Sequence, residues 1–137
     1  MAYLPWQDEY SVGVKEFDEQ HKILFGIINE LGDALDGGED RESVREIMKH
    51  LLRYTRVHFR DEELNQIFYD YPEYKKHKDE HERLTNEVVE YALDLSAKPE
   101  LAPKMMSFLQ NWILKHILVN DVKYTKFFEG KDIMEWE

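Results

Sequence analysis

The chain contains no cysteine, and only six glycines and four prolines are present among its 137 residues. The absence of cysteine excludes disulfide bonds, thiolate metal sites and cysteine catalysis, and it fits a reducing compartment. Few glycines and prolines, together with 34% charged residues, favour helices. No apolar run approaches the roughly 18 residues of a membrane-spanning helix, and no signal peptide is visible. We therefore expect one soluble, cytoplasmic domain spanning residues 1–137.

Positive charge is also scarce, because 18 Lys and Arg face 29 Asp and Glu and leave a formal net charge of −11. Such an acidic chain argues against nucleic acid or an anionic membrane as a partner. Bound cations would offset part of this charge. We expect a monomer.

Apolar residues recur at spacings of three and four in four segments, which predicts four amphipathic helices. Glycines after the first segment and prolines around the third mark the ends. The short connections place consecutive helices antiparallel, so we expect an all-α, up-down-up-down four-helix bundle. The expected helices cover about residues 18–36, 40–69, 72–98 and 101–119; the bundle spans residues 18–121, an extended N-terminal arm 1–17, and a C-terminal tail 122–137.

Five of the six histidines fall at one end of this expected bundle. One lies near the start of the first helix, one in the last third of the second, two open the third, and one lies near the end of the fourth: His21, His58, His77, His81 and His116. The two on the third helix are four residues apart and share a face. The sixth, His50, is eight residues before His58 and about 80° off that face, so we expect it on the surface.

Two carboxylates follow the same pattern. Glu62 lies one helical turn beyond His58, and Asp121 lies five residues beyond His116. Five residues turn an α-helix by about 500°, which leaves Asp121 roughly 140° from the histidine. It reaches the same site only if the helix loosens near its end, or if the carboxylate reaches across between two ions.

Each of these residues alone is more often a hydrogen-bonded core histidine or a solvated carboxylate than a metal ligand. The seven residues taken together favour a metal site, because burying five imidazoles and two carboxylates without a cation is very costly. Seven ligands exceed the needs of one tetrahedral zinc, whereas two octahedral ions sharing bridging carboxylates use them naturally. Imidazole and carboxylate without thiolate suit iron, and manganese less well. The pattern therefore predicts a dinuclear iron centre.

Four stretches carry a family resemblance: "VGVKEFDEQH", "HFRDEE", "HKDEH" and "HILVND". Over nearly its whole length the chain resembles the hemerythrin family in its bacterial single-domain form. The resemblance implies that His77, His81 and His116 bind one iron, that His21 and His58 bind the other, and that Glu62 and Asp121 bridge them beside an oxo or hydroxo group. O2 would bind at the open position of the second iron and be held as hydroperoxide. The residues that match the family's apolar O2 pocket are Leu24, Phe59, Trp112 and Leu118.

Two adjacent positions depart from the family pattern. Where the family commonly has Leu-Met after the bridging glutamate, this chain has Asn65 and Gln66. We expect water nearer the irons as a result. Asn65 either accepts the free ring N–H of a ligand histidine, for which we expect His77, or meets water at an open helix end.

The resemblance implies reversible O2 binding, as a carrier, a store or a source for an O2-consuming recipient, and not an enzyme. Five neutral imidazoles favour ferrous iron, and an apolar wall keeps solvent from displacing the bound ligand. The alternatives are an O2 or redox sensing module, peroxide, nitrite or nitric oxide chemistry at the same irons, and iron storage.

Overall fold

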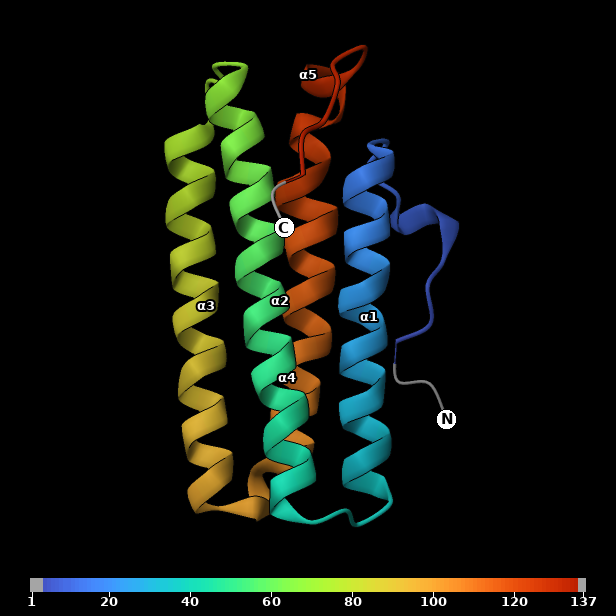
Figure 1. Ribbon diagram of the computed structural model, residues 1–137, viewed down its shortest axis with the longest axis vertical. Coiled ribbons are helices and arrows are strands. Elements are labelled where there is room, and N and C mark those ends of the chain that lie inside the picture. Colours follow the sequence, from blue (N-terminus) through green and yellow to red (C-terminus); the bar gives the residue numbers. More distant parts are fainter. Residues whose placement is uncertain (1–3, 136–137) are drawn as a thin grey trace.

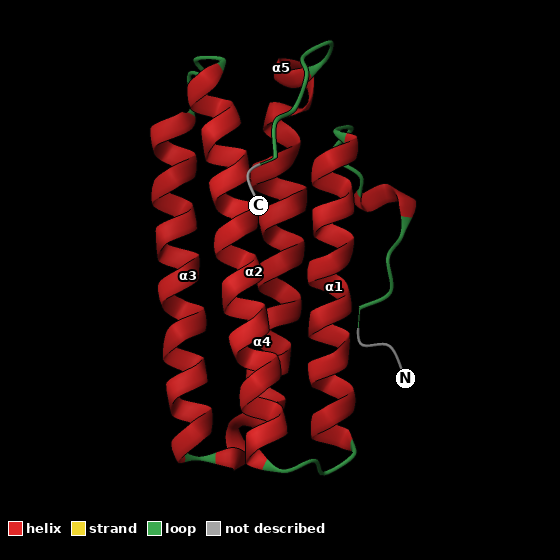
Figure 2. Ribbon diagram, viewed as in Figure 1, coloured by secondary structure: helices red, strands yellow, loops and turns green. Residues whose placement is uncertain are grey.

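The computed structural model describes residues 4–135, apart from the side chains of residues 95–97, 99, 119, 120 and 122. Within this part the chain is helical and contains no strand (Figure 2). Four long helices form the body: α1 Lys15–Asp36, α2 Arg41–Phe68, α3 Tyr74–Ala97 and α4 Ala102–Lys115. Shorter helical segments flank them: Asp8–Tyr10, Pro99–Leu101, a π-helical turn at His116–Asn120, a 3-10 turn at Asp121–Tyr124, and α5 Thr125–Phe128.

The predicted up-down-up-down four-helix bundle is confirmed (Figure 1). Helix α1 packs against α2 and α4, and α3 packs against the same two helices, so α2 and α4 occupy diagonal corners of the bundle. The start of α1, the end of α2, the start of α3 and the end of α4 therefore lie at one end, which is the top of Figure 1. This connectivity brings together the four stretches that carry the histidines.

The helix ends follow local rules. The Asp40 carboxylate accepts a hydrogen bond from the backbone N–H of Ser43 at 2.8 Å and so caps α2. Gly38, in the loop after α1, has a φ of +67° that favours glycine. Helix α1 begins at Lys15, earlier than the residue 18 that the sequence predicted. Asp18 accounts for the difference, because its carboxylate accepts the N–H of Val12 at 2.8 Å and ties the arm back onto the first turn.

The two ends of the bundle differ in chemistry. At the end away from the histidines, the buried side chains that the structure describes are apolar, and Leu31, Leu51, Val88 and Leu109 are fully buried. Most of the buried polar and charged side chains that the structure describes lie instead toward the histidine end, and they include every predicted ligand. Apolar burial stabilises the first end, whereas the second needs specific polar pairing to be stable.

The segments outside the bundle pack onto it. The rings of Trp6 and Tyr10 lie within 6 Å of each other and of Phe25, and they anchor the N-terminal arm on α1. The residues after α5 turn back and run along the histidine end of the bundle (Figure 1). None of the described helices is long and apolar enough to cross a membrane.

Candidate metal centre

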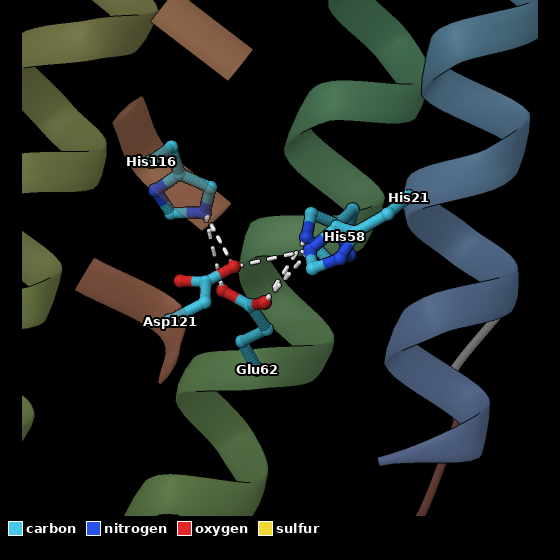
Figure 3. Close-up of side chains that lie close together, drawn as sticks. All are labelled: His21, His58, Glu62, His116 and Asp121. Atoms are coloured by element: carbon cyan, nitrogen blue, oxygen red, sulfur yellow. Dashed lines mark ion pairs between the residues drawn. The ribbon is translucent and has the colours of Figure 1, made fainter. Parts of the chain in front are cut away.

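All seven predicted ligands meet inside the histidine end of the bundle, and each is at most 7% exposed. Each helix of the bundle contributes. His21 comes from α1, His58 and Glu62 from α2, His77 and His81 from α3, and His116 and Asp121 from the end of α4 and the turn that follows it. Five of them are drawn in Figure 3, with the two carboxylates between the imidazole rings.

The Glu62 carboxylate divides the histidines into two groups. Its Oε2 lies 3.1 Å from Nε2 of His58 and 3.5 Å from Nε2 of His21. Its Oε1 lies 3.1 Å from Nε2 of His81 and 3.3 Å from Nε2 of His77. One oxygen therefore faces each group, as in a carboxylate that bridges two cations.

Asp121 spans the same two groups. Its Oδ2 lies 3.0 Å from Nε2 of both His21 and His116, and its Oδ1 lies 3.1 Å from Nε2 of His77. The π-helical turn at His116–Asn120 makes this possible. In that turn the N–H of Asp121 bonds to the carbonyl of His116, five residues earlier. The wider turn brings Asp121 back onto the face of His116, which is the loosening that the sequence required.

Two histidines turn Nε2 toward the carboxylates because Nδ1 of each ring is held by a hydrogen bond. Nδ1 of His58 donates to Oε1 of Gln20 at 2.6 Å, and Nδ1 of His81 lies 2.7 Å from a Glu63 carboxylate oxygen. Both partner oxygens can only accept, so Nδ1 carries the proton and Nε2 has a free lone pair. Those lone pairs face the negative oxygens of Glu62.

Many of the converging atoms have no hydrogen bond to any described residue. They include Nε2 of His21, His58, His81 and His116 and both carboxylate oxygens of Asp121. Buried polar atoms are rarely left without a partner. A cation between these atoms removes the cost of leaving them unpaired, because it accepts lone pairs from both the nitrogens and the oxygens. Two overlapping groups of donors, each within 4.8 Å, could hold an ion: His21, His58, Glu62, His116 and Asp121, and Glu62, His77, His81, His116 and Asp121.

Electrostatics within the cluster show the same attraction for positive charge. Burial opposes a charge on each imidazole, but the carboxylates of Asp121 and Glu62 outweigh burial and raise the pKa of His77 to about 9 and that of His116 to about 10. Burial dominates at His58 and lowers its pKa. Burial also opposes charge on the two carboxylates, yet the surrounding imidazoles hold the pKa of Glu62 and Asp121 below the usual range. A metal ion would compete with protons for these sites.

Three residues that support the ligands were missed by the sequence analysis: Gln20, Glu63 and Tyr124. Tyr124 is fully buried, and its hydroxyl donates to Oε2 of Glu62 at 2.7 Å. Burial raises the pKa of Tyr124 well above 10, so the hydroxyl keeps its proton. Gln20 and Glu63 each adjoin a ligand in the sequence, and Tyr124 follows Asp121 by three residues. That proximity was the only available signal, since helical spacing alone does not reveal which polar neighbour turns inward.

Three of the four residues assigned to an apolar pocket are buried beside the cluster: Leu24, Phe59 and Trp112. The Phe59 ring stacks on His81 at 3.7 Å and lies 6.2 Å from the ring of Trp112. The assignment of Leu118 was wrong, because its side chain is 42% exposed. Leu118 lies two residues after His116, on the opposite side of the turn, and so points away from the buried face that carries His116. Its neighbour Ile117 is fully buried instead.

Both expectations for Asn65 were also wrong. The residue is fully buried, so it does not meet water, and its amide does not contact His77. Its Nδ2 donates to the carbonyls of Asp61 and Met134, both at 2.7 Å, and its Oδ1 accepts the N–H of Met134 at 2.9 Å. Asn65 therefore holds the C-terminal segment against α2. His50 is exposed, as predicted.

Comparison with known proteins gives the same family that the sequence motifs indicated. Residues 12–126 match the family model of the hemerythrin HHE cation binding domain. The chain is 33% identical over 124 residues to bacteriohemerythrin of Pseudomonas aeruginosa (90% of this chain, 80% of that protein). It is 31% identical over 119 residues to a hemerythrin-like protein of Naegleria gruberi (87% and 88%). A crystal structure of wild-type hemerythrin superimposes with a TM-score of 0.82 at 25% identity, covering 91% of this chain and 97% of the other.

Proposed function

Since this chain belongs to the hemerythrin family, we propose that it binds dioxygen reversibly at a pair of iron ions held by the seven clustered side chains. By the bonding preferences of imidazole and carboxylate, iron suits this donor set, which contains no thiolate. His77, His81 and His116 would hold one ion, His21 and His58 the other, and Glu62 and Asp121 would bridge them beside an oxo or hydroxo group. Bound there, two ferrous ions would supply the two electrons that dioxygen takes up on binding and returns on release.

The observation that carries this proposal is the arrangement around Glu62. Its two oxygens face two separate histidine groups at 3.1 Å, and Nε2 of both His58 and His81 presents a lone pair to them. Lone pairs at this distance repel unless a cation lies between them. Two such positions on one carboxylate support two ions rather than one.

The residues around the cluster have distinct tasks in this function. Gln20 and Glu63 fix the ring orientation and tautomer of His58 and His81, which keeps both Nε2 atoms available for metal. The Tyr124 hydroxyl donates a hydrogen bond to Glu62 and so offsets part of the negative charge on that carboxylate. The unequal number of histidines leaves an open position at the ion that only two of them hold, which is where a small ligand would bind.

Apolar side chains support binding rather than turnover. Leu24, Phe59 and Trp112 are buried and form part of the wall on one side of the cluster. They offer no nucleophile or general base for a substrate, and they exclude water, which would otherwise displace the bound ligand. We therefore propose a carrier, store or source of dioxygen and not an enzyme.

Iron content and the visible spectrum test this function. The protein is loaded anaerobically with ferrous iron, and iron is counted per chain. The spectrum is then recorded before exposure to O2, after it, and after O2 is removed by argon. We expect two irons per chain and a charge-transfer band that appears with O2 and disappears without it. One iron per chain, or a band that persists under argon, would contradict the proposal.

A pair of histidine variants checks the ligand assignment. His81→Ala should lose at least one iron and several kcal/mol of the metal's contribution to stability. His50→Ala removes an exposed imidazole and should change neither iron content nor Tm. Equal loss in the two variants would mean that the seven-residue cluster does not hold the metal.

A further inference from the structure

Positive charge is concentrated on one helix of this acidic protein. Between residues 41 and 60, six Lys and Arg face only two Glu, whereas the rest of the chain has 12 basic and 27 acidic residues. Five of the chain's six arginines lie in this stretch. The six cations, here called the basic stripe, are all exposed on α2: Arg41, Arg45, Lys49, Arg53, Arg56 and Arg60. They span about 120° of the helix circumference and about 28 Å of its length.

The basic stripe is largely unpaired within the molecule. Lys49 pairs with Glu46 at 3.1 Å, and Arg60 lies 3.8 Å from Asp61. The other four make no salt bridge with any residue that the structure describes: Arg41, Arg45, Arg53 and Arg56. The surface charge of the stripe therefore contributes little to the fold and stays available to an external anionic group.

One end of the basic stripe borders the metal centre. A surface cavity of about 470 Å³ between α2 and α3 is lined by the exposed Arg56 and Arg60 and, among others, by Glu63 and the buried Phe59 and His81. Of the seven predicted ligands, His81 lines this cavity. The Phe59 ring stacks on His81 with the ring centres 3.7 Å apart. A partner bound over this end of the stripe would therefore approach the cluster from the side of His81.

We propose that the basic stripe docks an acidic electron-carrier protein, which reduces the iron pair after it has become oxidised. This inference rests on the proposed function. Dioxygen is small and neutral and diffuses to a buried site without a docked partner, whereas an electron passes between proteins only when their redox groups come close. Each encounter moves one electron from the reduced carrier to one ferric ion. Two encounters reduce the pair, and one electron leaves the carrier each time.

The charge distribution favours a compact protein over an extended anion. A nucleic acid or an anionic membrane carries negative charge beyond the 28 Å of the stripe, and that charge would meet the net −15 of the remaining chain. A folded protein with a local acidic patch can contact the stripe without covering most of the acidic surface. Charge complementarity of this kind raises the association rate and is weakened by salt.

Binding of an acidic [2Fe–2S] ferredoxin, measured by calorimetry at low and physiological salt, tests the docking surface. The stripe variant Arg53→Glu/Arg56→Glu should bind at least about tenfold more weakly than the wild type. The control Lys75→Glu/Lys104→Glu changes net charge equally at two exposed lysines outside the stripe, and should stay within about twofold. Equal weakening in both variants would show a net-charge effect only, and an unaffected stripe variant would also overturn the proposal.

Two further probes separate the alternatives. Vesicles with 30% phosphatidylserine and a 20-base-pair DNA duplex should bind more weakly than ferredoxin, and tighter binding of either would overturn the assignment to a protein partner. Stopped-flow reduction of the ferric protein by reduced ferredoxin should slow at least about tenfold in the stripe variant and not in the control. The binding measurement stands whether or not the chain holds iron, so a failure of the proposed function shows separately in the iron count.

Discussion

At the residue scale, the chemistry of the cluster depends on single hydrogen bonds that fix the imidazoles. Gln20 shows this most clearly. Its amide oxygen accepts from Nδ1 of His58 at 2.6 Å, while its amide nitrogen donates to Oδ2 of Asp61 at 2.9 Å. The amide is thereby oriented by a third residue, and it in turn selects the His58 tautomer that leaves Nε2 free.

Replacing Gln20 by leucine keeps the size of the side chain but removes this orientation. We expect Gln20→Leu to lower the affinity for the ion held by His21 and His58 by about 10- to 100-fold, because hydrogen bonds to metal ligands typically contribute that much. Competition with a chromophoric chelator measures the change. Glu19→Ala, at the exposed neighbouring position, should retain wild-type affinity. Unchanged affinity in Gln20→Leu would mean that packing alone orients His58.

At the scale of the element, two irregular segments shape the site. The π-helical turn at the end of α4 brings the Asp121 carboxylate next to the clustered imidazoles, which a regular α-helix would not do. The segment after α5 is held by Asn65, which pairs with both the N–H and the carbonyl of Met134, and by Tyr69, whose hydroxyl donates to the carbonyl of Asp132 at 2.6 Å. Neither feature is a regular helix, yet both lie at the histidine end.

The Asn65 contact predicts a measurable release of the C-terminal segment. Asn65→Ala removes the paired hydrogen bonds, and we expect faster hydrogen exchange at the Met134 amide and a loss of about 1–3 kcal/mol in stability. Ile67→Ala changes an exposed side chain on the same helix and should leave exchange as it is. Wild-type protection of Met134 in Asn65→Ala would show that other contacts hold the segment.

At the scale of the whole molecule, the buried cluster makes stability depend on pH and metal. In metal-free protein the folded pKa values of His77 and His116, about 9 and about 10, lie above the ordinary 6.5. Their protonation therefore stabilises the fold fully below pH 6.5, and this contribution is lost as the pH rises through 9 to 10. The lowered pKa values of Glu62 and Asp121 act in the opposite sense, so their contribution is lost in acid.

Thermal unfolding should show this dependence. We expect the Tm of chelator-treated protein to fall by several degrees between pH 6.5 and 9.5. Iron-loaded protein should not show this fall, because the metal replaces the protons, and it should lose its metal in acid instead. A metal-free Tm that rises over this range would contradict the charge arrangement described for the cluster.

The sequence by itself determined the bundle, its topology and the seven side chains that cluster at one end. Spacings of three and four define helix faces, and short connections between four helices leave few arrangements, so His21, His58, His77, His81 and His116 had to share one end. The tertiary structure decided what depends on the direction of single side chains and on irregular backbone. It turned Leu118 to the surface, directed Asn65 to Met134 instead of His77, and brought Tyr124 from the tail onto Glu62. The physical reason is that helical periodicity specifies a face to within a turn, whereas a hydrogen bond depends on distances that only the packed chain sets.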